Sequence, residues 1–166
     1  MKSLSAVVLG LAAATLMSAP SMAADLMIDT PAVVPSSSVN WDGFYAGIQA
    51  GYDLDGYAPV QGVIGANMTA SESFLIGIEL AIGPYFDVGG GGGPGYQGYL
   101  VGRAGVLAGP ALFYGMAGVN DVDGGFDWIV GVGAEFSVAD NVSARFQIAQ
   151  YDTSFTDLTA GVFWHF

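Results

Sequence analysis

The sequence contains no cysteine and very few basic residues. Its 166 residues include three Lys and Arg but fifteen Asp and Glu, which gives a net charge of −12 at pH 7. Without cysteine the chain has no disulfide framework, no zinc finger and no thiol nucleophile. The scarcity of Lys and Arg excludes nucleic acid as a partner, because neutralising phosphates requires these residues.

The chain beyond residue 24 also lacks an apolar run long enough for a membrane-spanning helix. Its longest stretch without a charged residue, 104–120, is interrupted by Pro110 and by four glycines, whereas a helical span needs about 20 predominantly apolar residues. Hydrophobic residues nevertheless make up 52% of the sequence and charged residues only 11%, against about 25% charged residues in ordinary soluble domains. This composition fits strands that have one face in lipid and the other in a narrow lumen.

Residues 1–23 have the three parts of a secretory signal peptide. Lys2 provides a positive start, an apolar core extends from Leu4 to Met17, and the small residues Ser21 and Ala23 precede the expected cleavage site. The core is shorter than a membrane span, so we expect cleavage rather than a permanent anchor. Residues 24–40, rich in Pro, Ser, Thr and Asp, are predicted to form a flexible periplasmic lead to a barrel at 41–166.

Alternating apolar and polar residues predict eight strands in the segment 41–166. At the C-terminal end, apolar residues from Leu158 to Phe166 occupy every second position, and polar or small residues occupy the others. An open sheet edge is not tolerated in hydrocarbon, so strands in lipid must close on themselves. We therefore predict an all-β fold, an eight-stranded antiparallel up-and-down transmembrane barrel. The segment 111–119 is apolar on both faces, which leaves its lipid and lumen faces unassigned.

Four charged residues fall on positions that the alternation turns inward: Glu79, Arg103, Glu135 and Arg145. The first two are equidistant from the middle of a five-glycine run, and the last two from the middle of an Ala-Asp-Asn turn. If the chain reverses there, each glutamate lies directly opposite its arginine on the neighbouring strand. We interpret these residues as salt bridges that fill the lumen, because unpaired buried charge is costly. A polar plug or an ion-selecting lining is the functional alternative.

Glycines also recur at inward-facing positions, among them Gly65 and Gly133. Small lining residues would leave a water-filled cavity, or they would permit the sharp bends that close a barrel. The pattern favours neither. Three aromatic residues at strand ends, Trp41, Trp164 and Phe166, are predicted to lie at the membrane interface.

No residue pattern indicates a metal site, a cofactor site or a catalytic site. Asp121 and Asp123 form part of an Asp-x-Asp-Gly segment, but the remaining ligands of a calcium loop are missing. We expect a solvated acidic rim, with cations that bridge its aspartates to lipopolysaccharide phosphates as a hypothesis. His165, the only histidine, is expected at a lumen end or at the interface, because its spacing suggests no Ser-His-acid set.

Several segments resemble the small porin-family, opacity-type (OmpA-like) outer-membrane barrels. The resemblance is carried by Trp-Asp-Gly-Phe-Tyr-Ala-Gly at 41–47, by Gly-Val-Gly-Ala-Glu-Phe at 131–136, and by the closing segment 161–166, which ends in His-Phe. It implies an outer membrane with its lipids and lipopolysaccharide as surroundings, and recognition of the C-terminal aromatic strand by the barrel assembly machinery. It also implies a structural role in the envelope. A narrow channel is the alternative, and a lipid A-modifying enzyme is disfavoured because His165 falls at the periplasmic rim.

Overall fold

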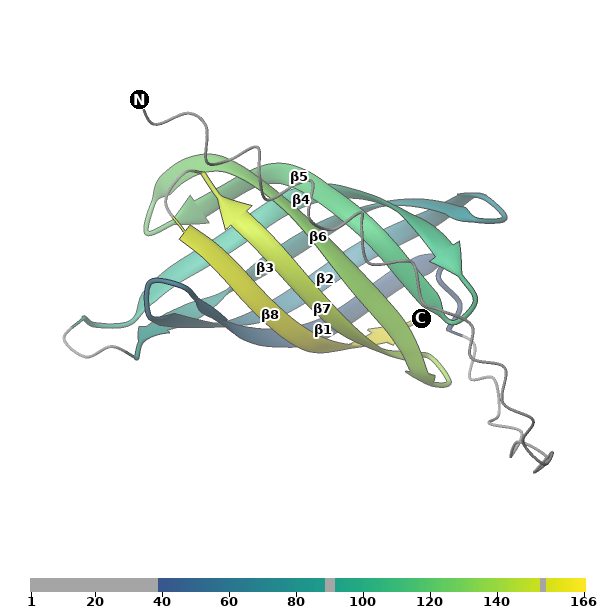
Figure 1. Cartoon of the computed structure of the whole chain (residues 1–166), viewed down its shortest axis with the longest axis horizontal. Helices are drawn as coiled ribbons and strands as arrows, with labels where there is room; N and C mark the ends of the chain where they lie inside the picture. The colour runs from purple at the N-terminus through teal and green to yellow at the C-terminus, as the bar shows by residue number, and fades with distance from the viewer. Residues whose placement is uncertain (1–38, 89–91, 153–154) are drawn as a thin grey trace, which may run out of the picture. The chain divides into compact units, whose positions relative to one another are not determined.

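The computed structural model describes residues 39–88, 92–152 and 155–166. These residues form the eight strands labelled in Figure 1: β1 (Gly43–Asp53), β2 (Tyr57–Ser71), β3 (Phe74–Asp87), β4 (Gly95–Ala108), β5 (Ala111–Val122), β6 (Gly125–Ala139), β7 (Val142–Tyr151) and β8 (Phe155–His165). The predicted signal peptide, 1–23, and nearly all of the predicted lead, 24–40, lie outside the described residues. Within these residues, no helix has the length and apolar character that a membrane crossing requires.

The eight strands form a closed antiparallel barrel. Each strand pairs with its neighbours in sequence, and β1 also pairs with β8, where Ile48 lies opposite Val162. Closure gives every strand a partner on both edges, so that no row of backbone N–H and C=O groups is left unpaired. The predicted fold class, an all-β eight-stranded up-and-down barrel, is therefore confirmed.

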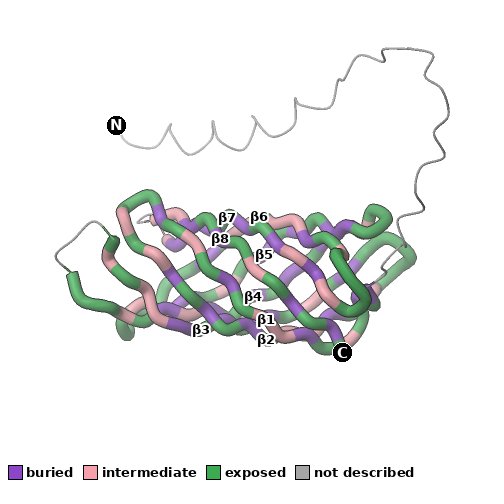
Figure 2. The backbone as a smooth tube through the Cα atoms, turned by 90° about the horizontal axis from the view of Figure 1, so that it is seen from below, coloured by how far each residue is buried: buried purple, intermediate pink, exposed green. Residues whose placement is uncertain are grey.

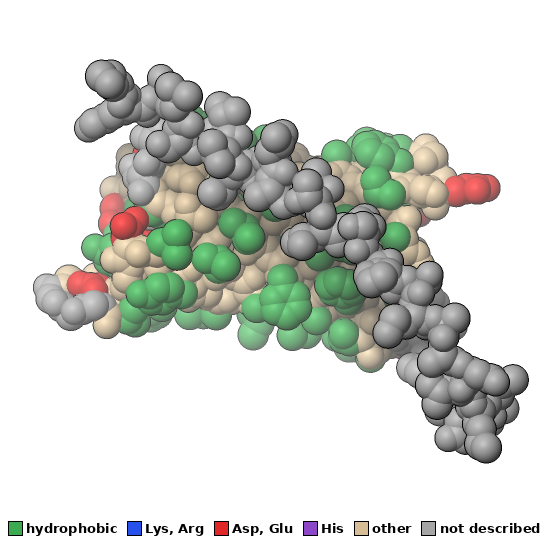
Figure 3. Space-filling model, viewed as in Figure 1, with side chains coloured by type: hydrophobic (Ala, Val, Ile, Leu, Met, Phe, Trp, Pro, Cys, Tyr) green, Lys and Arg blue, Asp and Glu red, His purple; other side chains and the backbone are tan. Residues whose placement is uncertain are grey.

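Burial alternates along the strands, as Figure 2 shows, because successive side chains point to opposite faces of the wall. Large apolar side chains point outward and are widely exposed: Ile48 is 70% exposed and Ile82 63%. Figure 3 shows such side chains spread along the wall of the barrel, with acidic side chains at its ends. The inward positions hold a mixture of aromatic, aliphatic and polar side chains, most of them buried.

The faces of β5, which the sequence leaves unassigned, are resolved by the pairing of this strand. Leu112, Tyr114 and Met116 point into the lumen and are buried, whereas Phe113 and Val119 are each 51% exposed on the outer wall. Both faces of β5 are apolar because its inward side chains, Leu112, Tyr114 and Met116, pack into the filled lumen.

Three strands, β3, β5 and β6, extend into segments that contain turn-forming residues such as Asp and Gly. β3 continues through Asp87, and residues 84–87 pair with β2 and in part with β4. β5 and β6 are joined by a tight hairpin, in which Asp123 and Gly124 form the turn between the paired residues Val122 and Gly125. Both turn residues have positive φ angles, 50° and 88°, which is typical of a type I′ turn and is favoured by an Asp-Gly sequence.

Acidic residues gather at one end of the barrel. The connections that follow β1, β3, β5 and β7 lie at this end, which we call the aspartate rim. The aspartate rim comprises Asp53, Asp55, Asp87, Asp121, Asp123, Asp127, Asp152 and Asp157. The opposite rim, where the chain ends, carries only Asp42, Glu72 and Asp140 among the described acidic residues.

Candidate functional site in the barrel lumen

Four charged side chains meet inside the barrel. Glu79 comes from β3, Arg103 from β4, Glu135 from β6 and Arg145 from β7. All four are buried, from 0% exposed for Glu135 to 3% for Arg103. The two arginines balance the two glutamates, so this layer of the lumen, which we call the central cluster, has no net charge.

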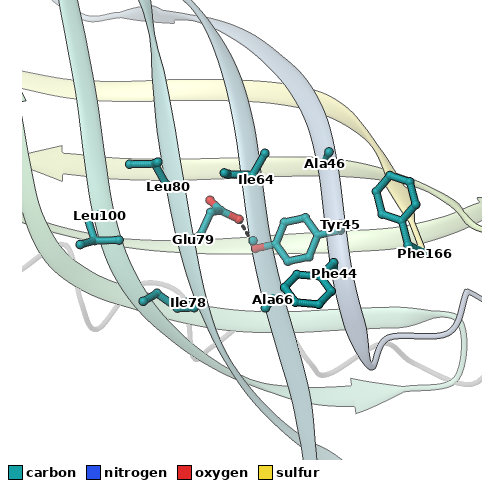
Figure 4. Close-up of a pocket in the computed structure, with 11 residues that line it drawn as sticks. Phe44, Tyr45, Ala46, Ile64, Ala66, Ile78, Glu79, Leu80, Leu100 and Phe166 are labelled. Carbon is teal, nitrogen blue, oxygen red and sulfur yellow. Dashed lines mark hydrogen bonds between the residues drawn. The ribbon is translucent and has the colours of Figure 1, made fainter.

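Glu79 accepts hydrogen bonds from both arginines and from two tyrosines. Its Oε2 lies 2.9 Å from Arg103 Nη1 and 2.6 Å from Arg145 Nη1. The Tyr45 hydroxyl donates to the same oxygen at 2.5 Å, as Figure 4 shows, and the Tyr99 hydroxyl donates to Oε1 at 2.9 Å. With both oxygens engaged by charged and neutral donors, the carboxylate is compensated for the water that it loses on burial.

Glu135 binds the same two arginines from the other side. Its Oε2 lies 3.1 Å from Arg103 Nη2 and 2.9 Å from Arg145 Nε. Arg145 Nη2 is also 2.9 Å away but is not aligned for a hydrogen bond, so Nε carries the contact. Ser143 Oγ donates to Oε1 at 2.6 Å. Each arginine therefore bridges the two glutamates, and the four charges form one connected network.

Aromatic rings enclose the two guanidinium groups. The central carbon of the Arg145 guanidinium lies 3.7 Å from the centroid of the Phe163 ring, and that of Arg103 lies 4.0 Å from the centroid of Tyr114. Such contacts stabilise a desolvated cation and fill the space beside it. Because water barely reaches any of the four charges, the central cluster and its rings seal the lumen at this level.

One of the two predicted charge pairs differs in register from the expectation. Glu135 lies directly opposite Arg145, but Glu79 lies opposite Val101, and Arg103 lies opposite Gly77. The β3–β4 ladder is therefore centred on position 90, one residue before the middle glycine of the run. Arg103 still reaches Glu79 diagonally, because a long side chain spans the distance to a neighbour two positions away.

The inward-facing glycines make room for aromatic rings. A Cβ atom added to Gly65 would overlap the ring of Tyr45, and one added to Gly133 would overlap the ring of Tyr114. These two glycines therefore do not leave a water-filled cavity, one of the two possibilities that the sequence left open. They allow the tyrosines to cross the lumen and reach the central cluster.

Ser143, His165 and Glu135 come together at the edge of the central cluster, although their spacing in the sequence does not suggest it. His165 Nε2 lies 3.0 Å from both Ser143 Oγ and Glu135 Oε1. The carboxylate only accepts hydrogen bonds, so Nε2 carries the proton. A serine nucleophile needs an unprotonated ring nitrogen as its base, with the acid on the other nitrogen. Here both contacts share Nε2, and Ser143 is fully buried.

Trp41 does not lie on the outer wall, and the prediction that it marks the membrane interface is wrong. It is 9% exposed, belongs to the buried apolar cluster, and packs edge-on against His165 with ring centroids 5.3 Å apart. Trp41 precedes β1, so the inward and outward alternation of that strand does not determine the direction of its side chain. Trp164 and Phe166 do face outward, at 51% and 72% exposed.

The aspartates of the β5–β6 hairpin stabilise turns. Asp121 accepts a hydrogen bond from the backbone N–H of Gly124 at 2.7 Å. Asp123 accepts hydrogen bonds from the Tyr85 hydroxyl and from the backbone N–H of Tyr96, and these hold the pKa of the Asp123 carboxyl below its usual range. In the part of the chain that the structure describes, no three Asp, Glu or His side chains form a group that could hold a metal ion.

Comparison with known proteins shows the fold alone. No family model matches the chain, and no curated protein matches it either. Among solved structures, the N-terminal β-barrel domain of OprF from Pseudomonas aeruginosa is similar with a TM-score of 0.57 and 16% identity, over 75% of this chain and 98% of that domain.

Two further solved structures are similar to the chain. Ail, the attachment invasion locus protein of Yersinia pestis, matches with a TM-score of 0.50 and 13% identity, over 75% of this chain and 99% of Ail. A structure from the de novo design of transmembrane β-barrels matches with a TM-score of 0.52 and 17% identity, over 74% of this chain and 93% of the designed one. The chain therefore has the fold of small transmembrane β-barrels.

Proposed function

We propose that the chain is an integral outer-membrane protein with a structural role in the envelope of a Gram-negative cell. The observation that carries this proposal is the combination of an apolar outer wall with a sealed lumen. A wall of this kind favours lipid, and a lumen closed by the central cluster offers no route for solutes. The role is therefore that of a stable element embedded in the membrane rather than that of a pore.

The outer wall supports the membrane environment. Large apolar side chains are exposed on every strand, for example Phe44 at 72% and Val132 at 60%. Soluble monomers rarely expose apolar patches of more than a few hundred Å², whereas the lipid-facing wall of a membrane barrel is apolar throughout. Trp164 and Phe166 at the C-terminal end suit the aromatic girdle of such a wall.

The orientation and route of assembly follow from the proposed signal peptide and from the resemblance to opacity-type barrels. Cleavage near Ala23 would release the chain into the periplasm, and the C-terminal strand would be recognised by the barrel assembly machinery. The start of β1 and the end of β8 would both lie on the periplasmic side. The aspartate rim, at the other end of the barrel, would then face outward, toward the lipopolysaccharide leaflet. Divalent cations would then bridge its carboxylates to lipopolysaccharide phosphates.

Conductance across a planar lipid bilayer tests the structural role against the alternative of a narrow channel. We expect a silent bilayer with the purified, folded chain. Channels of one reproducible size would instead favour transport. One observation favours the channel, namely two buried polar atoms in the lumen. Gln49 Oε1 and Gln61 Nε2 have no hydrogen-bond partner among the described residues, and buried polar groups of this kind usually bind water.

The same recordings require a control that distinguishes a native pore from a damaged barrel. Gly102 lies on the outer wall, where an added Cβ has no neighbouring atom closer than 3.9 Å, so Gly102→Ala is expected to leave any conductance unchanged.

An enzyme acting on lipid A is the third possibility. The protonated Nε2 of His165 disfavours it, because this nitrogen cannot accept the proton of Ser143.

A further inference from the structure

A groove crosses the outer wall from β1 to β4, and Figure 4 shows the side chains that line it. Its volume is about 440 Å³, and we call it the first groove. The alanine side chains leave the wall low, whereas Phe44 and Ile64 stand out from it, at 72% and 58% exposed. Strand pairing arranges most of the outward-facing lining in two rows, Phe44, Ala66 and Ile78 in one and Ala46, Ile64 and Leu80 in the other.

The first groove extends from the rim where the chain ends to the middle of the wall. Phe44 is the second residue of β1, next to that rim, whereas Leu100 is the sixth of the 14 residues of β4. Figure 4 shows Phe44 and Phe166 toward one end of the groove and Leu80 and Leu100 toward the other. A lipid in one leaflet has the same extent, because its headgroup lies at the interface and its chains end near the midplane.

A second groove, of about 460 Å³, begins beside the first on the other side of β1. The two grooves share Ala46, and the second continues over β8 and β7 along Val162, Trp164 and Val142. A water molecule, which is close in size to a methylene group, occupies about 30 Å³ in the liquid. Each groove therefore holds about fifteen methylene groups, as in one acyl chain. The pair matches the two chains of one diacyl lipid.

The rim beside the grooves carries exposed negative charge. Asp42, which precedes β1, is exposed and accepts a hydrogen bond from the backbone N–H of Thr69 in β2. This bond holds the carboxylate between β1 and β2, where the first groove begins, and Glu72 is exposed in the turn after β2. Among the described residues, the only Lys or Arg side chains are those of Arg103 and Arg145, both buried in the central cluster. The rim therefore favours a headgroup with N–H donors over one with net negative charge.

We propose that the two grooves bind one diacyl phospholipid whose headgroup carries a primary ammonium group, as in phosphatidylethanolamine. The proposal rests on the membrane environment proposed above for the outer wall. The acyl chains lie over Ala46 and Ala66 and contact the larger side chains on both sides, which would lose these dispersion contacts if the hollows stayed empty. The ammonium group donates to the Asp42 carboxylate.

Other lipids of an outer membrane fit these grooves less well. A phospholipid with a net negative headgroup would place its charge beside Asp42 and Glu72, without an accessible arginine or lysine among the described residues to compensate it. Lipopolysaccharide lies in the other leaflet in the proposed orientation, because the grooves begin at the rim opposite the aspartate rim. A second copy of the chain is the remaining occupant, and the experiment below distinguishes it.

Ala66→Leu tests the first groove without changing the lumen. Ala66 lies between Phe44 and Ile78 on the outer face of the wall, so the three added carbon atoms occupy the place of the acyl chain. Ala117→Leu is the matched control, because Ala117 is an exposed, outward-facing alanine of β5 outside both grooves. Asp42→Asn removes the charge at the rim and retains an oxygen that can accept the Thr69 N–H.

Native mass spectrometry of the full folded chain in an uncharged detergent measures lipid binding. The probes are dioleoyl phosphatidylethanolamine and, as an anionic competitor with identical chains, dioleoyl phosphatidylglycerol. We expect one bound molecule of the ethanolamine lipid in preference to the glycerol lipid. Ala66→Leu should weaken this binding at least about tenfold, the effect of losing about two buried methylene groups. Ala117→Leu should bind like the wild type, and Asp42→Asn should lose the preference between the two lipids.

Four results would overturn the proposal: equal binding of the two lipids by the wild type, unchanged binding in Ala66→Leu, an unchanged preference in Asp42→Asn, or a dimer of the chain that Ala66→Leu dissociates. If Ala66→Leu does not give heat-modifiable migration on a gel, Ala46→Leu takes its place, because Ala46 lines both grooves, and wild-type binding in that variant would count equally against the assignment. Failure of the proposed membrane role has a separate sign, a folded chain that stays dissolved without detergent.

Discussion

Arg145 Nη1 lies 2.6 Å from Glu79 Oε2, although β7 and β3, the strands that carry them, are not neighbours in the barrel. The contact therefore crosses the lumen. The second ion pair of Arg145, with Glu135, joins residues that face each other on adjacent strands. Together these contacts connect opposite parts of the wall through one side chain, which ties the barrel across its interior.

Replacing Arg145 by Met should therefore destabilise the barrel strongly. Removal of one partner leaves buried carboxylate charge without compensation, which costs about 3–5 kcal/mol. Unfolding by urea in lipid vesicles, followed by tryptophan fluorescence, measures the loss. In the double variant Arg145→Met with Glu79→Gln, the free-energy change should be smaller than the sum of the single changes, because the residues interact directly. Additive effects would show that the two side chains do not interact.

Gly65→Ala should destabilise the barrel by about 1–3 kcal/mol, the usual cost of overpacking a filled interior. The new methyl group would displace the Tyr45 ring and lengthen the hydrogen bond from Tyr45 to Glu79. Gly102→Ala is the matched control, since its methyl group points to open space on the outer wall and should be neutral or slightly stabilising. Equal unfolding midpoints for the two variants would contradict the filled lumen.

Trp41→Ala should open the rim at which the chain ends. The Trp41 ring packs against His165, which is 2% exposed. Without this ring, diethyl pyrocarbonate should modify His165 several times faster than in the wild type, as followed by mass spectrometry. Trp164→Ala removes an outward-facing ring and should leave the rate unchanged. A slow, unchanged rate in Trp41→Ala would show that the residue does not cover the histidine.

The Asp123 hydrogen bonds should be lost in acid. Because the Tyr85 hydroxyl and the Tyr96 N–H hold the folded pKa of Asp123 below its usual range, the contact is complete above the unfolded value of about 3.9. It weakens as the pH falls through the lower folded value. The chemical shift of the Tyr96 amide should therefore be constant from neutral pH to about 4 and move only below that. Asp123→Asn should abolish this movement; a shift centred near neutral pH would contradict the assignment.

The architecture follows from the sequence because the alternation of apolar and polar residues along the chain predicts the strands, their number and, except for β5, their faces. The lumen charges Glu135 and Arg145 could be paired for the same reason, since their hairpin turn is short and well marked. The β3–β4 register could not be obtained, because a run of glycines has no residue that marks its centre. The strand faces of β5 depend on tyrosine and leucine side chains that fill the lumen.

Other features depend on contacts that no local pattern encodes. Trp41 lies inside the barrel because it precedes β1, so the period of that strand does not determine its direction. The contact of Ser143 with His165 joins two strands, and the pair of Asp53 and Asp157 joins the first strand to the last. Such pairs become visible only after the barrel closes. The turn at Asp123 and Gly124 is an exception, because an Asp-Gly dipeptide is a strong local hairpin signal.

The orientation of the wall toward lipid is the central claim, and nitroxide accessibility tests it most directly. Because the chain has no cysteine, single cysteines can be introduced at the outward positions Ile76, Ile78, Leu80 and Ile82 of β3 and spin-labelled in vesicles. The account predicts that oxygen, which concentrates in the bilayer, collides with all four labels more often than a water-soluble nickel complex does. More frequent collisions with nickel along the whole strand would contradict it.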